Sequence, residues 1–173
     1  MAETMRRLET EYHAGLTKTL EVSSESFTAN GDIPPVFTCR GVGHSPEVTW
    51  KNVPANAMSY VLIFIDWDVA SQRVPTSSIT HWMLYNIPRQ ETAIAAGTTS
   101  ADLRRKTIVE GENSFGERGY AVPCARSQHR YIVRIYALDV PEIHPLSRDR
   151  EAIVESMRGH ILSFGELAGH FGS

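Results

Sequence analysis

Hydrophobic residues along the chain fall in short runs that favour β-strands over long helices. Three runs are rich in β-branched and aromatic residues, at 58–66, 80–87 and 129–138. Because most positions in these runs are apolar, we expect strands buried on both faces. Two shorter segments, 17–22 and 47–50, alternate between polar and apolar residues and predict further strands.

The remaining segments predict helices and loops. Ile153, Met157 and Ile161 recur at i, i+4 and i+8, so residues 147–168 predict one or two helices near the C-terminus. Residues 89–128 contain several glycines and predict a long loop. Strands followed by a helix indicate a mainly β fold of antiparallel sheets with peripheral helices.

Length and composition point to one ordinary globular domain. The chain has 173 residues, of which 42% are hydrophobic and 21% charged. We expect residues 1–16 to be an N-terminal extension or short helix, and residues 17–173 to be a single domain. The formal charge is −3 and no basic patch stands out, which argues against a nucleic-acid partner.

Targeting signals and cysteine usage favour a cytoplasmic location. The N-terminus lacks the apolar region of a secretory signal, and no apolar run is long enough to span a bilayer. Cys39 and Cys124 are far apart and match no metal-ligand spacing. We expect free thiols in a reducing cytosol, with a disulfide as the less favoured alternative.

Polar residues that could carry chemistry lie at the ends of the three strongest strands. Asp66, Trp67 and Asp68 close the first, and residues two apart in a strand share a face, so both carboxylates could point the same way. Asp is also common in solvated turns. His81 opens the second strand, where a histidine could equally be a core residue.

His129 and Tyr131 open the third strand and should also share a face. A His and a Tyr side by side offer two donors, which suits a phosphate or an oxyanion. The alternative is a strand end whose polar residues face solvent. The glycines of residues 111–120 predict a flexible loop, and Ser114 lacks the setting of a hydrolase nucleophile. No metal-ligand spacing is present, and we expect no metal and no cofactor.

Several short motifs, taken together and in order, resemble the bacterial-type branch of the phosphatidylethanolamine-binding protein family. The resemblance covers residues 18–171. The motifs are Phe-Thr-Cys-Arg-Gly at 37–41, with Ser45, Pro46 and Trp50 after it; Asp-Trp-Asp-Val-Ala at 66–70; His-Trp-Met-Leu-Tyr-Asn-Ile-Pro at 81–88; Gly119-Tyr120; Pro123-Cys124; His-Arg-Tyr at 129–131; and Gly-Glu-Leu-Ala-Gly at 165–169, which resembles the ending of a C-terminal helix.

The resemblance implies two packed antiparallel sheets with a few peripheral helices, including a C-terminal one. It also implies a pocket for phosphate-like or carboxylate anions, with one wall formed by the 119–124 loop. The residues expected to bind the ligand are Asp66, Trp67, Asp68, His81, Tyr120, Val122, Pro123, His129 and Tyr131.

The sequence departs from the family pattern around this pocket. Trp67 and Ala70 replace the two prolines of the family's Asp-Pro-Asp-Ala-Pro motif, and Val69 replaces its alanine. Val122 and Ser127 stand where glycine is usual. Loss of proline predicts a softer loop, and Trp67 could cover the pocket or contact an apolar ligand.

Two functions compete for this pocket, and a third interpretation bypasses it. The favoured one is binding of a small anionic or phospho-headgroup ligand, which could regulate a partner protein. The alternative is a cofactor-independent acid/base enzyme, a lyase, isomerase or cyclase of small-molecule biosynthesis acting on a partly apolar substrate. Its catalytic residues would be Asp66, Asp68, His81, His129 and Tyr131. A purely protein-binding regulator rests on family analogy alone.

Overall fold

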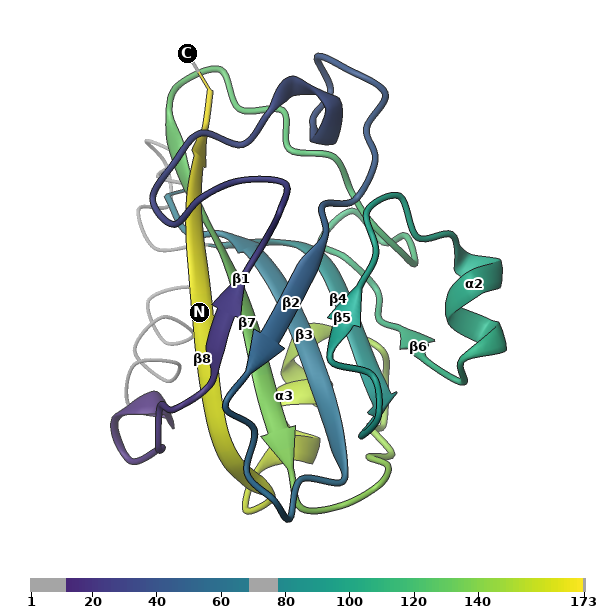
Figure 1. Ribbon diagram of the computed structural model, residues 1–173. Helices are drawn as coiled ribbons and strands as arrows, with labels where there is room; N and C mark the ends of the chain where they lie inside the picture. Colours follow the sequence, from purple (N-terminus) through teal and green to yellow (C-terminus); the bar gives the residue numbers. More distant parts are fainter. Residues whose placement is uncertain (1–11, 69–77, 173) are drawn as a thin grey trace.

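The computed structural model describes residues 12–68 and 78–172, and these form two antiparallel sheets with a few short helices (Figure 1). The larger sheet has the strand order β6-β4-β3-β7-β8, and the smaller sheet has the order β1-β2-β5. The strands are β1 (Glu21–Ser23), β2 (Val48–Lys51), β3 (Ser59–Asp66), β4 (Ile79–Pro88), β5 (Ala93–Ile94), β6 (Val109–Glu110), β7 (His129–Leu138) and β8 (Ile161–Phe171). The helices are η1 (Pro35–Phe37), α2 (Ser100–Arg105) and α3 (Arg150–Met157). The two packed sheets confirm the expected fold class.

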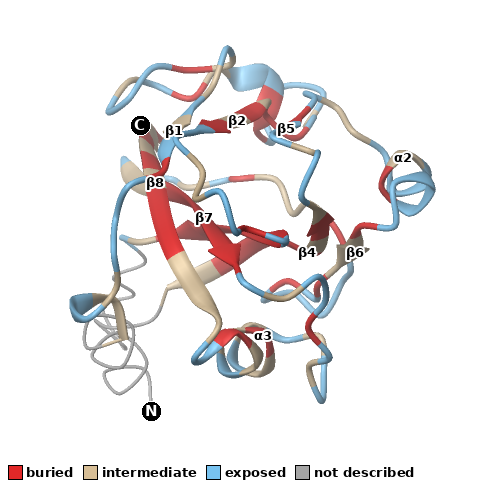
Figure 2. Ribbon diagram, turned by 60° about the horizontal axis from the view of Figure 1, so that its bottom comes forward, coloured by how far each residue is buried: buried red, intermediate tan, exposed pale blue. Residues whose placement is uncertain are grey.

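The larger sheet is covered on both faces, which explains the unbroken apolar runs in its central strands. Every residue of β3 is buried. Its even-numbered residues, such as Leu62 and Phe64, pack toward the smaller sheet with Trp50 and Trp82. Its odd-numbered residues pack on the opposite face, where α3 lies (Figure 2). The expected strands 58–66, 80–87 and 129–138 are therefore confirmed within a residue or two.

The C-terminal segment corrects the expectation of a helix over residues 147–168. Helix α3 ends at Met157, and Gly159 with φ of 80° turns the chain away from it. Residues from Ile161 onward form β8, which pairs antiparallel with β7 along its whole length. The helical spacing of Ile153 and Met157 is real, but Ile161 belongs to a strand whose side chains alternate in burial after Gly165.

The other expectations are met in part. Residues 89–128 are mostly irregular but include β5, α2 and β6, and α2 begins with a capping box between Thr99 and Asp102. The expected strand at 17–22 is shorter and starts at Glu21. In the leading segment, residues 12–14 are helical. Within the described ranges, no helix has the length and hydropathy to cross a membrane.

Candidate functional site

The three inner strands of the larger sheet bring polar residues together at one end of the sheet. β3 ends at Asp66, β7 starts at His129, and β4 enters the sheet just before His81. Asp66 stands opposite Tyr131 in the β3–β7 register and opposite Ile79 in the β3–β4 register. Asp66 faces Tyr131 across the β3–β7 pair and His129 lies two residues before Tyr131, so these three share the face toward the smaller sheet. His81 joins them because the β3–β4 register shifts between Phe64/Trp82 and Ile65/Thr80, which leaves His81 as the extra residue of a bulge with its ring near that of Tyr131.

Asp66 and His129 form the central pair of the cluster. Asp66 is 3% exposed, and its Oδ2 accepts a hydrogen bond of 2.7 Å from Nδ1 of His129. Since a carboxylate can only accept, Nδ1 of His129 carries the proton. The Oδ1 atom of Asp66 accepts the backbone N–H of Asp68 at 3.1 Å. The carboxylate is therefore fixed on both oxygens and holds the His129 ring in one orientation.

Tyr131 supplies a hydroxyl that keeps its proton. The residue is 1% exposed, and its ring lies 5.6 Å from that of His81 and 6.5 Å from that of His129. Burial raises the pKa of Tyr131, and the negative charge of Asp66 raises it further. Tyr131 is consequently a hydrogen-bond donor at any ordinary pH.

His81 is held by the backbone of Ala121. The Nδ1 atom of His81 donates to the carbonyl of Ala121 at 2.7 Å, and the N–H of Ala121 donates to the carbonyl of His81 at 2.8 Å. Burial lowers the pKa of His81 and outweighs the opposing effects of Ala121 and Asp66. In the neutral ring with a proton on Nδ1, Nε2 is an acceptor. The rings of Phe64 and Phe115 each lie 6.0 Å away, which makes the surroundings largely aromatic.

The loop at 119–124 is tied to the loop that follows η1. Tyr120 stacks on Phe64 at 6.0 Å and donates its hydroxyl to the carbonyl of Phe37 at 2.8 Å. The N–H of Cys39 donates to the carbonyl of Pro123 at 3.0 Å. Val122 packs directly on Gly43, where an added Cβ would lie 2.7 Å from its Cγ1.

A disulfide completes this wall and corrects the expectation of free thiols. Cys39 and Cys124 are bridged, with Cα atoms 5.3 Å apart. Their separation in sequence conceals the fact that the fold places the two loops side by side.

Comparison with known proteins assigns the family. The sequence model of the family described as phosphatidylethanolamine-binding protein matches residues 23–172. This chain belongs to the phosphatidylethanolamine-binding protein family.

Relatives and solved structures agree with this assignment. A UPF0098 protein of Methanothermobacter thermautotrophicus is 36% identical over 152 residues, covering 87% of this chain and 97% of that protein. A putative phosphatidylethanolamine-binding protein homolog, CT736 of Chlamydia trachomatis, superposes with a TM-score of 0.80 at 33% identity, covering 91% of this chain and 99% of that one. E. coli YbcL shares the fold, with a TM-score of 0.78 at 21% identity over 90% of this chain and 99% of that one.

Of the five residues expected to be catalytic if the chain is an enzyme, four meet in the cluster, and Asp68 stands at its margin. Asp68 is exposed, and its Oδ2 accepts the backbone N–H of Arg130 at 3.0 Å. Asp68 therefore ties the end of β3 to β7 through one of its carboxylate oxygens. Within the described part of the chain, no group of three or more His, Cys, Asp or Glu residues is placed to hold a metal ion.

Trp67 does not line the cluster of this family member. It packs against the core on the opposite face of the sheet, where the guanidinium of Arg134 lies 5.1 Å from its ring centroid. The idea that Trp67 covers the pocket is therefore wrong. The other replaced positions of the motif, Val69 and Ala70, lie outside the described residues.

Sequence reasoning missed Asn113, which shapes the loop before the wall. Asn113 is 5% exposed, and its amide donates to the carbonyl of Gly119 at 3.1 Å. Its Oδ1 accepts the N–H groups of Phe115 and Glu117 at 3.0 and 3.2 Å. The signal was available, because Asn-Ser with a glycine three residues after the Asn is typical of turns organised by a side chain.

Proposed function

We propose that this chain binds a small anionic ligand of the phospho-headgroup type at the cluster of Asp66, His81, His129 and Tyr131. The observation that carries the proposal is the buried Asp66–His129 pair with Tyr131 beside it. His129 keeps 20% of its side chain exposed, whereas Asp66 is closed off beneath it. The histidine is thus the member of the pair that can meet a ligand.

Charge balance explains how an anion could be accepted next to a buried carboxylate. With His129 protonated, the Asp66–His129 pair is neutral, and Nε2–H of His129 becomes a charge-assisted donor. Tyr131 is 1% exposed beside the pair and keeps its proton because burial and Asp66 raise its pKa, so it would be a second donor to an anion that enters the cluster through His129. An anion placed against these two groups would gain hydrogen bonds without confronting the carboxylate directly.

His81 gives the proposed site an acceptor as well. Its neutral ring donates Nδ1–H to Ala121, which leaves Nε2 able to accept a proton from a ligand. A headgroup that carries both a phosphate and an ammonium, or a phosphate that keeps one proton, matches two donors and one acceptor. O-Phosphoethanolamine has this combination and is the probe of choice.

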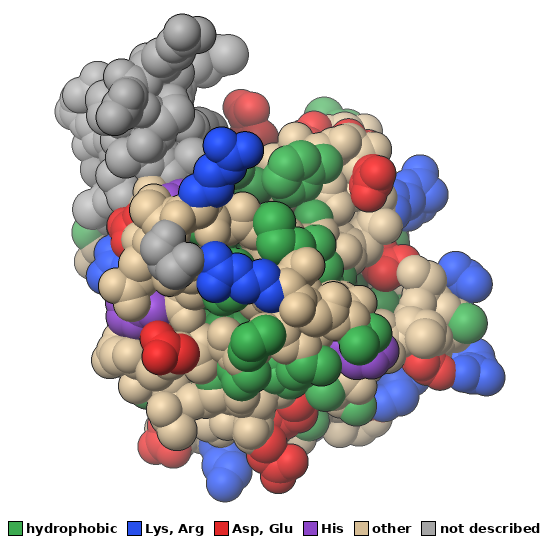
Figure 3. Space-filling model, turned by 90° about the horizontal axis from the view of Figure 1, so that it is seen from above, with side chains coloured by type: hydrophobic (Ala, Val, Ile, Leu, Met, Phe, Trp, Pro, Cys, Tyr) green, Lys and Arg blue, Asp and Glu red, His purple; other side chains and the backbone are tan. Residues whose placement is uncertain are grey.

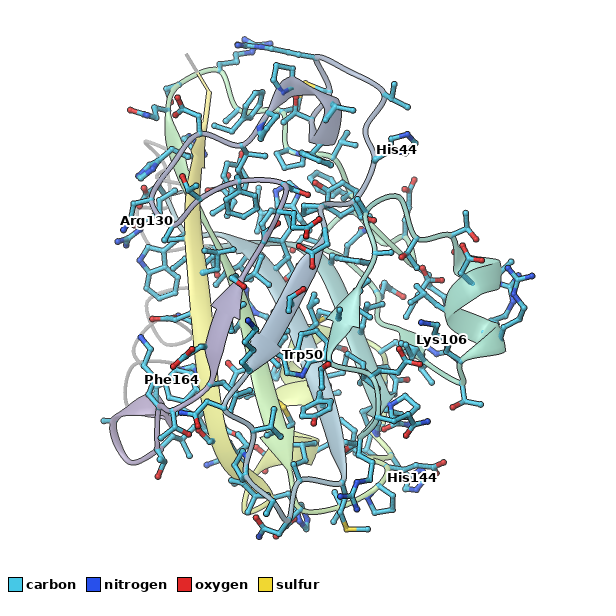
Figure 4. All side chains as sticks on the ribbon, in the orientation of Figure 1. His44, Trp50, Lys106, Arg130, His144 and Phe164 are labelled. Carbon is cyan, nitrogen blue, oxygen red and sulfur yellow. A yellow bond between two sulfur atoms is a disulfide. The ribbon has the colours of Figure 1, made fainter. Side chains whose placement is uncertain are left out.

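The test is calorimetric titration with O-phosphoethanolamine. We expect saturable binding that His129→Ala weakens at least about tenfold, because a hydrogen bond to a charged group contributes about 1.5–3 kcal/mol. His144→Ala is the matched control, because His144 is exposed and lies at the far end of the molecule (Figure 4). Equal affinity in wild type and His129→Ala would refute the proposal, provided circular dichroism shows that the variant is folded.

One observation favours acid/base catalysis as a second candidate. A neutral, buried His81 lies among Phe64, Phe115 and Tyr131, close enough to the Asp66–His129 pair for their charges to act on it. A base and an acid would then face the same small molecule. Exchange of carbon-bound protons of small carbonyl compounds in D2O, followed by NMR, tests this. Exchange that His81→Asn abolishes would support catalysis, and exchange no faster than in buffer would exclude it for those compounds.

A further inference from the structure

An exposed aromatic ring stands beside the cluster. Phe115 is 60% exposed, yet its ring lies 6.0 Å from that of His81, which is itself 3% exposed. The rings of Phe64 and Tyr131, which also lie against His81, belong to residues that are each 1% exposed. Phe115 is therefore the part of these aromatic surroundings that a ligand can reach.

Hydrogen bonds on both sides of Phe115 fix its backbone. The N–H of Phe115 donates to Oδ1 of Asn113 at 3.0 Å. Its neighbour Ser114 donates its N–H to the carbonyl of Thr80 at 3.0 Å and accepts the N–H of Thr80 on Oγ at 2.8 Å. Gly116, with φ of 77°, closes the turn by donating its N–H to the carbonyl of Asn113 at 3.1 Å. The turn is thus joined to the start of β4, and a ring on a fixed backbone loses little conformational freedom when a ligand binds.

The end of the molecule that carries the cluster also presents apolar surface. It is the end drawn at the top of Figure 1, because His129 pairs with Phe171 next to the C-terminus. Figure 3 views this end and shows hydrophobic side chains near the middle of the face, with most acidic ones toward its rim. Apolar surface around a few convergent polar groups is the usual lining of a small-molecule site.

We propose that Phe115 determines the specificity of the site and selects phosphate monoesters whose ester group is apolar. The inference rests on the proposed function, because the phosphate would meet His129 while the ester group lies on the ring of Phe115. Contact between the two apolar surfaces removes both from water and so favours binding. Inorganic phosphate and methyl phosphate have too little apolar surface to gain from this contact.

The spacing of the rings fits an ester group of small size. Ring centroids are 6.5 Å apart between His129 and Tyr131, and 5.6 Å apart between Tyr131 and His81. The ring of Phe115 follows 6.0 Å beyond that of His81. A phosphate bound at the histidines therefore has Phe115 within reach of a single attached ring or short chain.

One exposed ring favours an apolar group over an ammonium. Proteins that recognise organic ammonium groups typically surround them with a cage of several aromatic rings. Phe64 and Tyr131 are too buried to complete such a cage around a group lying on Phe115. An ammonium would also lose hydration on the ring, whereas an apolar group gains from the same contact. The ammonium of O-phosphoethanolamine would instead meet the acceptor of His81.

NMR titration of the full chain with phenyl phosphate and methyl phosphate tests this inference. The two esters carry the same charged group, so the ratio of their affinities isolates the effect of the ester group. We expect phenyl phosphate to bind wild type about tenfold more tightly, and Phe115→Ala to reduce this ratio to about twofold. Phe115→Leu, which keeps apolar surface at the position, should give an intermediate ratio. Leu146→Ala is the matched control, because it removes an exposed apolar side chain from the loop before α3, and it should retain the full ratio.

Two outcomes would overturn the inference: equal affinities of wild type for the two esters, or a ratio in Phe115→Ala as high as in Leu146→Ala. The first comparison needs no variant, so it holds whatever the substitutions do to folding. Wild type alone also separates this inference from the proposed function. If methyl phosphate and O-phosphoethanolamine bind but phenyl phosphate gains nothing, only the role of Phe115 fails. If none of the three binds, the proposed function fails and the inference fails with it.

Discussion

Removal of the Cys39–Cys124 bridge by a double substitution to serine should destabilise the protein markedly. The bridge closes a loop with a sequence separation of 85 residues. In the chain-entropy account, a cross-link of that span lowers the conformational entropy of the unfolded chain, which raises the free energy of unfolding by about 4.6 kcal/mol at room temperature. Losses measured on removing native disulfides are about 2–5 kcal/mol, so we expect a decrease within that range.

The folded wall should survive the loss of the bridge. Tyr120 still donates to Phe37, and Cys39 contributes its backbone N–H to Pro123 whatever its side chain. These hydrogen bonds act on the folded chain and place no restraint on the unfolded one. We therefore expect a native fold with lower stability, and only a small change in affinity for O-phosphoethanolamine.

Urea unfolding followed by tryptophan fluorescence measures this effect, because Trp50 and Trp82 are each 1% exposed and report directly on the core. Wild type in the presence of a dithiol reductant is the matched control and should unfold at the same urea concentration as the variant. A decrease in the free energy of unfolding of less than about 1 kcal/mol would refute the entropic reasoning. So would a variant much less stable than reduced wild type, since the serines would then be the cause.

Two further predictions concern backbone approach and protonation. Gly165→Ala would place a Cβ 2.1 Å from the carbonyl oxygen of Leu20, so we expect the free energy of unfolding in urea to decrease by about 1–3 kcal/mol. Gly15→Ala is the control and should leave stability unchanged, because no atom lies within 4 Å of its Cβ. Equal stability of the two variants would contradict this prediction. Burial lowers the pKa of His81 below its value of about 6.5 in the unfolded chain. The stability that neutral His81 contributes is therefore complete above about pH 6.5 and is lost as the pH falls through the folded pKa. The free energy of unfolding should decrease over that range by up to about 1.4 kcal/mol per pH unit. His81→Asn, which can still donate to Ala121, should show a shallower decline in acid, and parallel pH profiles for the two proteins would refute the assignment.

The central strands could be predicted because burial on both faces requires apolar residues at nearly every position. β3 is buried on both faces, between the smaller sheet and α3, so its sequence is apolar throughout. β7 is nearly as buried and has the same character. Such runs need no knowledge of the partner strands, which is why their bounds were predicted within a residue or two.

β8 could not be recognised in the same way. Its glycines leave room for segments that pack closely against the strand. The backbone of Leu20 contacts Gly165, and the side chains of Phe27 and Ile33 contact Gly169. In sequence, these glycines suggest breaks in a helix. The glycines are needed because of contacts with segments more than a hundred residues earlier in the chain, and local periodicity gives no sign of such contacts.

The candidate site also has one part that could be predicted from the sequence and one part that could not. Asp66, His129 and Tyr131 lie at the ends of strands whose period of two could be read from the sequence, so their common face followed from position alone. The wall depends on pairs between loops: Cys39 with Cys124 and Phe37 with Tyr120, separated by 85 and 83 residues. Nothing periodic constrains such pairs, because each loop leaves a different strand and the meeting point is set by how the two sheets pack. The common face of Asp66, His129 and Tyr131 could therefore be predicted from the sequence, while the position of His81 and the contacts that hold it and the loops around it required the structure.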